Sequence, residues 1–163
     1  VRIEMICGKR VLDYLNMINE QNHQISVKLS AKMDKTAQAV ERLQEENFRL
    51  KGQVGQLVDD MCRKEAERYA GSGSVLIFMD GMDADSVRKL ADAVTQTCQG
   101  CCAVFSRNAD GSYKYAMGEK DGDLRRFTKE MNEKLNGRGG GKPFFVQGSV
   151  QASEKEIRNF FEQ

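Results

Sequence analysis

Glycines and cations are concentrated in one short stretch near the C-terminal end of this 163-residue sequence. Residues 137–143 read Gly-Arg-Gly-Gly-Gly-Lys-Pro, and the glycines free the backbone to bring several N–H groups towards one anion. More cations lie upstream, on a segment with a helical pattern. The predicted contact residues are Arg125, Arg126, Lys129, Arg138, Gly139, Gly140, Gly141 and Lys142. They predict a face that binds the phosphates of a nucleic acid.

This stretch is not a P-loop, because Lys142 is followed by Pro143 and a strand-like segment instead of Ser or Thr and a helix. A simpler interpretation stays open, namely a flexible turn surrounded by ordinary surface cations. The net charge is +1 at pH 7. Any affinity for nucleic acid must therefore come from a local patch and not from a basic field over the whole chain.

The cysteines give weak evidence for metal or redox chemistry. Cys98 and Cys101 form a CxxC pair, but no second pair has the spacing of metal ligands and the single histidine, His23, lies in a distant helical segment. We therefore expect no cofactor and no metal in this chain. Cys98 also fits the apolar stripe of its helix and should be buried. Five cysteines without a leader sequence indicate reduced thiols and a cytoplasmic protein.

No set of side chains predicts catalysis. Asp80, Asp83 and Asp85 form an acidic cluster, but turn formation and helix capping explain it. No Ser–His–Asp or Cys–His arrangement can be assembled around His23, so we predict no catalytic residue. No apolar run is long enough to cross a membrane, and a membrane partner is not expected.

The elements that precede the α/β region are predicted to form a helical arm. Residues 9–70 contain no proline. Two series of residues in this range are spaced alternately by three and four positions, as in heptad repeats. The polar stretch between the series predicts an antiparallel hairpin that turns near residues 31–36, which the matching register favours over an intermolecular coiled coil. In that register Asn22 faces Asn47. The two series are Val11, Leu15, Ile18, Asn22, Ile25 and Leu29, and Val40, Leu43, Asn47, Leu50, Val54, Leu57 and Met61.

Residues 74–163 are predicted to form a small α/β domain after the boundary Gly71-Ser-Gly73. The expected order is β-α-β-β-α-β-α, in which helices pack on one mixed sheet. Asp83 and Ser153 are predicted helix caps. The expected strands are 74–79, 102–107, 112–117 and 144–150, the expected helices are 83–98, 122–136 and one after 153, and 137–143 is the connecting loop.

Three stretches resemble, in order, the C-terminal part of the alanyl-tRNA synthetase and alanyl-tRNA editing family. Residues 1–12, VRIEMICGKRVL, resemble the last strand of the tRNA-editing domain, at 1–8, and its exit helix. LSAK at 29–32 and AVERLQEEN at 39–47 are similar to the helical hairpin. GGGKPFFVQGS, from 139 onward, is similar to the glycine-rich signature of the DHH-associated domain. Where many relatives carry histidine, this sequence has Lys142, which leaves a phosphate contact as the implied role.

The resemblance implies a module of a longer protein that continues upstream of Val1 into a catalytic domain in cis. The parent would be an alanine–tRNA ligase or an alanyl-tRNA editing hydrolase in the cytoplasm, and its RNA partner would be tRNA, with tRNA-Ala expected. The editing zinc site of this family uses HxxxH and CxxxH motifs. Neither occurs here, so zinc is expected in the upstream editing domain of the parent and not in this chain.

Two functions compete on the sequence alone. The first is a tRNA-binding module that positions tRNA for the upstream catalytic domain. The second is an assembly module that makes the parent a homodimer through the arm or an exposed sheet edge, without direct RNA contact. The chain by itself is not expected to be an enzyme.

Overall fold

A computed structural model describes residues 7–162. The chain divides into two compact units, Val1–Val54 and Gly55–Gln163. The N-terminal unit holds α1 (Lys9–Lys28), the 3-10 helix η1 (Met33–Lys35) and the first part of α2 (Thr36–Arg68). The strand predicted at residues 1–8 lies outside the described residues, apart from its last two positions. Within the described part of the chain, no helix has the length and apolar character needed to cross a membrane.

The helical arm breaks between α1 and α2, where the polar stretch predicts a break. Ser30 takes a left-handed φ of +49° just after α1 ends. The side-chain nitrogen of Asn22 donates to the Met33 carbonyl oxygen over 3.0 Å, and the Thr36 hydroxyl donates to the Asn22 side-chain oxygen over 2.8 Å. These bonds fix η1 and the start of α2 to α1.

The predicted pairing of the two heptad series is wrong. Leu15 is 54% exposed and Leu43 is 52% exposed, so the series do not bury each other. Asn22 forms its hydrogen bonds with η1 and the start of α2 and not with Asn47. Nearby backbone and hydroxyl groups satisfy the Asn22 amide, so the amide does not require Asn47, further along α2, as a partner.

The C-terminal unit is built on a five-stranded mixed sheet, which confirms the predicted α/β class. The strand order is β1-β2-β3-β5-β4. Strands β1 and β2 are parallel, and the other neighbouring pairs are antiparallel. The elements are β1 (Val75–Asp80), α3 (Ala84–Thr95), β2 (Cys102–Arg107), β3 (Tyr113–Gly118), α4 (Leu124–Lys134), β4 (Arg138–Lys142), β5 (Phe145–Val150) and α5 (Glu154–Phe161).

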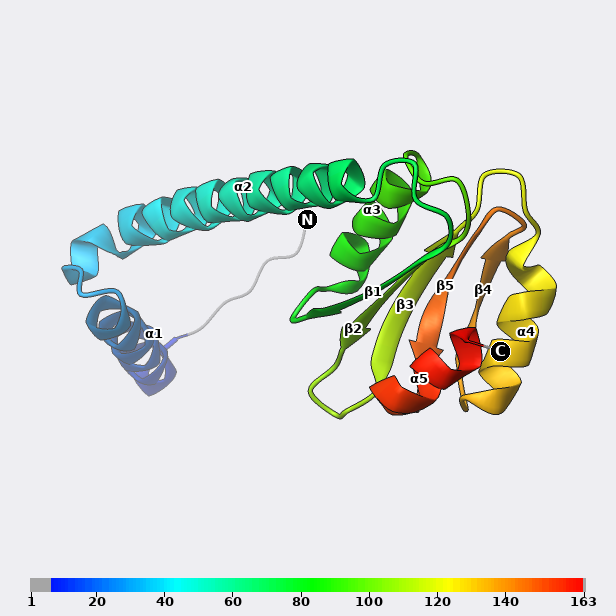
Figure 1. Cartoon of the computed structure of the whole chain (residues 1–163). Helices are drawn as coiled ribbons and strands as arrows, with labels where there is room; N and C mark the ends of the chain where they lie inside the picture. The colour runs from blue at the N-terminus through cyan, green and yellow to red at the C-terminus, as the bar shows by residue number, and fades with distance from the viewer. Residues whose placement is uncertain (1–6, 163) are drawn as a thin grey trace. The chain divides into compact units, whose positions relative to one another are not determined.

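Helices cover both faces of the sheet, with α3 on one face and α4 and α5 on the other (Figure 1). On the first face, Leu90 and Val94 of α3 pack against the sheet together with Cys62 from the end of α2. On the second face, Met131 of α4 and Ile157 of α5 are fully buried against strand residues. Because the end of α2 packs into the first core, the compact unit begins at Gly55 and not after α2.

The predicted helix caps are present. The Asp83 side chain accepts a hydrogen bond from the Ser86 N–H over 2.7 Å and opens α3. Ser153 and Glu156 form a reciprocal capping box at the start of α5. Each cap satisfies backbone N–H groups that a helix start otherwise leaves without a partner.

The glycine-rich stretch was predicted as a loop, and this part of the prediction is wrong. Its residues form β4, an edge strand in which Gly139 lies opposite Gly148 of β5. Glycine has a low intrinsic propensity for strands, so the amino-acid composition of this segment does not indicate a strand. Asn136 takes a left-handed φ of +49° just past α4, and the turn there leads the chain into β4.

Candidate nucleic-acid interface

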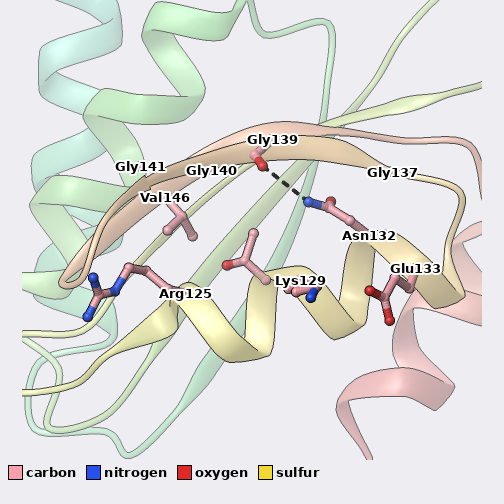
Figure 2. Close-up of a pocket in the computed structure, with 10 residues that line it drawn as sticks. Arg125, Lys129, Asn132, Glu133, Gly137, Gly139, Gly140, Gly141 and Val146 are labelled. Carbon is pink, nitrogen blue, oxygen red and sulfur yellow. Dashed lines mark hydrogen bonds between the residues drawn. The ribbon is translucent and has the colours of Figure 1, made fainter.

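A groove of about 390 Å³ runs between α4 and the glycine strand β4. Arg125, Lys129 and Asn132 approach it from α4, and Gly139 to Gly141 form the opposite side (Figure 2). The helix therefore supplies the side chains of the groove, and the strand supplies bare backbone.

Spacing along α4 separates its buried face from its groove face. Leu124, Thr128 and Met131, at intervals of four and three, are buried. Arg125 and Lys129 follow the buried residues Leu124 and Thr128 by one position and line the groove. Helical periodicity therefore places both cations along the same edge of the helix.

Asp123 anchors the start of α4. Its side chain caps the helix by accepting from the Arg125 N–H over 3.1 Å, and it also pairs with the Arg125 guanidinium over 2.6 Å. The hydrogen bond from the Arg125 side chain lowers the pKa of Asp123 to about 2. Arg125 is thus the groove cation whose charge is already partly neutralised by a carboxylate.

Asn132 joins the two sides of the groove. Its side-chain nitrogen donates to the Gly139 carbonyl oxygen over 3.3 Å, the bond drawn in Figure 2. Its side-chain oxygen accepts from the Tyr115 hydroxyl over 3.1 Å. These bonds hold the edge strand against α4 and fix the width of the groove at this point.

Thr128 places a buried hydroxyl beside the same groove. The residue is 2% exposed, and its Oγ1 has no hydrogen-bond partner among the described residues. A buried polar group without a partner costs about 1–3 kcal/mol. The Oγ1 atom is covered by protein, so Thr128 carries this cost beside the groove without presenting its hydroxyl to the groove.

The glycines of β4 are not equivalent. A Cβ on Gly139 would collide with the Gln147 carbonyl and the Tyr115 hydroxyl, so the fold requires glycine there. A Cβ on Gly140 would have no atom within 4 Å, and its φ is not positive. The fold does not require glycine at Gly140, although the residue lies on the groove.

The structure brings together only part of the predicted phosphate-binding set. Arg125, Lys129 and the three glycines line the groove, and Lys142 lines a second groove across β4. Arg126 and Arg138 are exposed but line neither groove. Among the described residues, no carboxylate pairs with Arg126, Lys129, Arg138 or Lys142.

The sequence patterns did not indicate five of the residues that line the groove, which are Thr128, Asn132, Glu133, Gly137 and Val146. A polar residue in the apolar stripe of an amphipathic helix is a possible signal, and Thr128 lies between Leu124 and Met131 in such a stripe. The role of Asn132 depends on where β4 lies, and the sequence analysis did not predict that strand.

The CxxC segment is part of the core, as expected for Cys98, which is buried. Burial raises the pKa of the Cys101 thiol to about 12, and burial also raises the pKa of Cys102. Among residues 7–162, no three His, Cys, Asp or Glu side chains are grouped so that they could hold a metal ion. The thiols are packing groups in this fold.

The sheet and the helices that form the groove lie within a stretch of the chain that matches a known domain family. Residues 72–163, more than half of the chain, match the model of the DHHA1 domain, and the chain belongs to this family. Its sequence is similar to alanine–tRNA ligases, which confirms the resemblance to the alanyl-tRNA synthetase family.

The alanine–tRNA ligase of Psychrobacter sp. (strain PRwf-1) is 24% identical over 94% of this chain, and that of Thiobacillus denitrificans is 26% identical over 87%. The chain covers 18% of the length of each of these two relatives. Among solved structures, the C-Ala domain from Aquifex aeolicus alanyl-tRNA synthetase is similar, with 19% identity and a TM-score of 0.48. That match covers 57% of this chain and 92% of the other.

Proposed function

We propose that this chain is the tRNA-binding C-terminal module of a protein related to alanyl-tRNA synthetase, and that the groove between α4 and β4 contacts the RNA backbone. One observation carries the proposal. The groove is bounded by exposed glycine backbone and by Lys129, a cation that no carboxylate pairs with among the described residues.

Two components of the groove match features of the RNA backbone. Lys129 supplies a positive charge for a phosphate. The bare strand lets the RNA approach closely, because glycine has no side chain to hold it away. Glu133 also lines the groove and opposes phosphate binding at its own end. The other predicted cations are exposed on the two elements that form the groove, Arg126 on α4 and Arg138 and Lys142 on β4, and attract phosphates at longer range.

The parent protein is part of the same proposal. The relatives are alanine–tRNA ligases, of which this chain covers about a fifth. We propose an upstream catalytic domain in cis that acts on alanyl-tRNA, either as a ligase or as an editing hydrolase. Zinc would belong to the editing domain of that parent. The present module would position tRNA and would carry no catalytic residue itself.

An assembly role is the second candidate, and the arm favours it. Leu43, Leu57 and Phe48 are exposed large apolar side chains on α2. Exposed apolar surface of this kind often marks a protein interface. A second copy could cover it. Analytical ultracentrifugation separates the two roles, because an assembly module is dimeric at micromolar concentration without RNA.

The proposal is tested by measuring how tRNA binds to variants that each lose one positive charge. Fluorescence anisotropy of labelled tRNA would compare the wild-type chain with Lys129→Ala and with Lys155→Ala, which loses the same charge on exposed α5. We expect Lys129→Ala to bind tRNA several-fold more weakly and Lys155→Ala to bind as the wild type does. No binding by the wild type, or equal losses in both variants, would contradict the proposal.

A further inference from the structure

A second groove lies on the other side of the glycine strand. It has a volume of about 410 Å³ and is lined by three cations, one carboxylate, that of Asp92, and an exposed aromatic ring. Arg88 and Lys89 approach it from α3, and Lys142 and Phe144 come from β4 and the turn that follows. Arg88 and Lys89 have exposed carboxylate partners, Asp85 and Asp59, and a phosphate can replace such partners because exposed ion pairs are weak.

Phe144 is an exposed ring on a rigid support. Its side chain is 50% exposed, whereas that of its neighbour Phe145 packs against the core. The Phe144 carbonyl oxygen accepts from the Glu119 N–H over 3.0 Å, and the Pro143 carbonyl oxygen accepts from the Leu124 N–H over 2.7 Å. Two backbone bonds therefore hold the turn in place while the ring faces solvent.

Lys142 adds a cation to this ring. Its ammonium nitrogen lies 5.8 Å from the centre of the Phe144 ring. An exposed aromatic ring beside a cation is the arrangement that binds unpaired nucleotides, in which a base stacks on the ring and the cation contacts a phosphate.

Gly140 connects the two grooves. Gly140 and Gly141 line both of them, so the grooves meet across β4. The fold tolerates a side chain at Gly140, as the open space around its Cβ position shows. The absence of a side chain there leaves a passage over the strand from one groove to the other.

We propose that an unpaired segment of RNA crosses β4 at Gly140, with phosphates in both grooves and one base stacked on Phe144. This inference rests on the proposed function and adds the kind of RNA that the module recognises. A continuous duplex hides the faces of its bases inside the stack, so only an unpaired or terminal base can cover the Phe144 ring.

Affinity for a short single-stranded RNA tests the stacking contact. Phe144→Leu keeps an apolar side chain but removes the ring, and we expect it to weaken binding about 5- to 150-fold, as the loss of one stacked base does. Phe48→Leu is the matched control, because Phe48 is 82% exposed on α2, far from the groove residues in sequence. It should bind this RNA as the wild type does.

A tryptophan probe reports stacking directly. The chain contains no tryptophan, so Phe144→Trp introduces a single indole fluorophore at the proposed contact. Its emission should be quenched when the single-stranded RNA binds and much less when a blunt duplex of the same sequence is added. Gly140→Val should leave the melting temperature unchanged and weaken binding of the single strand, because its side chain blocks the passage.

The outcomes separate this inference from the proposed function. If Phe144→Leu and Gly140→Val bind the single strand normally while Lys129→Ala loses tRNA affinity, the crossing is wrong and the proposed function stands. The crossing is also contradicted if Phe144→Leu and Phe48→Leu lose the same affinity for the single strand. It is contradicted as well if the duplex and the single strand quench the emission of the Phe144→Trp variant equally. If the wild-type chain binds no RNA, both proposals fail.

Discussion

The side-chain nitrogen of Asn132 donates to the carbonyl oxygen of Gly139 over 3.3 Å, and this bond ties α4 to the edge strand of the sheet. The same side chain accepts from the Tyr115 hydroxyl on β3. Asn132 thus links the helix, the edge strand and a central strand. The groove between α4 and β4 therefore has a fixed width before any ligand arrives, which lowers the entropic cost of binding.

Replacing Asn132 by Ala should destabilise the fold by about 1–3 kcal/mol, because it leaves the buried Tyr115 hydroxyl without a partner. Urea unfolding followed by circular dichroism measures this free energy. Tyr115→Phe removes the hydroxyl itself and should cost less. When Tyr115→Phe is already present, Asn132→Ala should cost less free energy of unfolding than it does alone. If the costs of the two substitutions simply add in the double variant, the two groups do not interact.

Thr128→Val should raise the stability of the fold. Valine keeps the shape of threonine but removes the buried hydroxyl, so up to about 1–3 kcal/mol of desolvation cost is relieved. Thr128→Ser keeps the hydroxyl and is the control. Urea unfolding measures the difference, and a Val variant that is no more stable than the wild type would contradict a hydroxyl without a partner.

The sequence predicts this fold wherever local patterns and tertiary packing agree. The apolar stripe of α3 and the caps at Asp83 and Ser153 are readable from residue spacing, and the structure has all three. Prediction fails where tertiary context overrides local preference. Strand β4 forms because β5 pairs with it, although its glycines disfavour strands.

The residues of the groove also divide into those that the sequence indicates and those that it does not. Arg125 and Lys129 are predictable because charge on a helix face is visible in the sequence. Thr128 is not, because a threonine in an apolar stripe usually satisfies its hydroxyl within its own helix. In the arm, the heptad spacing predicts Asn47 as the partner of Asn22, but the polar groups of Met33 and Thr36 satisfy the Asn22 amide locally.

The cysteines should differ sharply in reactivity in the folded protein. Burial raises the pKa of Cys101 to about 12, so almost none of it is thiolate at pH 8. Reactivity of Cys101 should grow only as the pH approaches that value or as the chain unfolds. Exposed Cys7 should be alkylated first, and Cys101 and Cys102 only in denaturant.

Mass spectrometry after brief iodoacetamide treatment measures this order of alkylation. Added zinc should not change it, since we predict no metal site in this chain. Rapid labelling of Cys101 at pH 8, or its protection by zinc, would contradict the structural role of the CxxC segment.

The salt dependence of tRNA binding tests the central claim most directly. Lys129→Ala combined with Lys142→Ala removes one cation from each side of β4. Each phosphate contact adds about 0.7–0.9 to the slope of log K against log salt, so the slope should fall by about 1.5. Lys64→Ala with Lys155→Ala removes the same charge from other exposed positions and should keep the wild-type slope. An unchanged slope in the folded Lys129/Lys142 double variant would contradict a phosphate-binding face at the glycine strand.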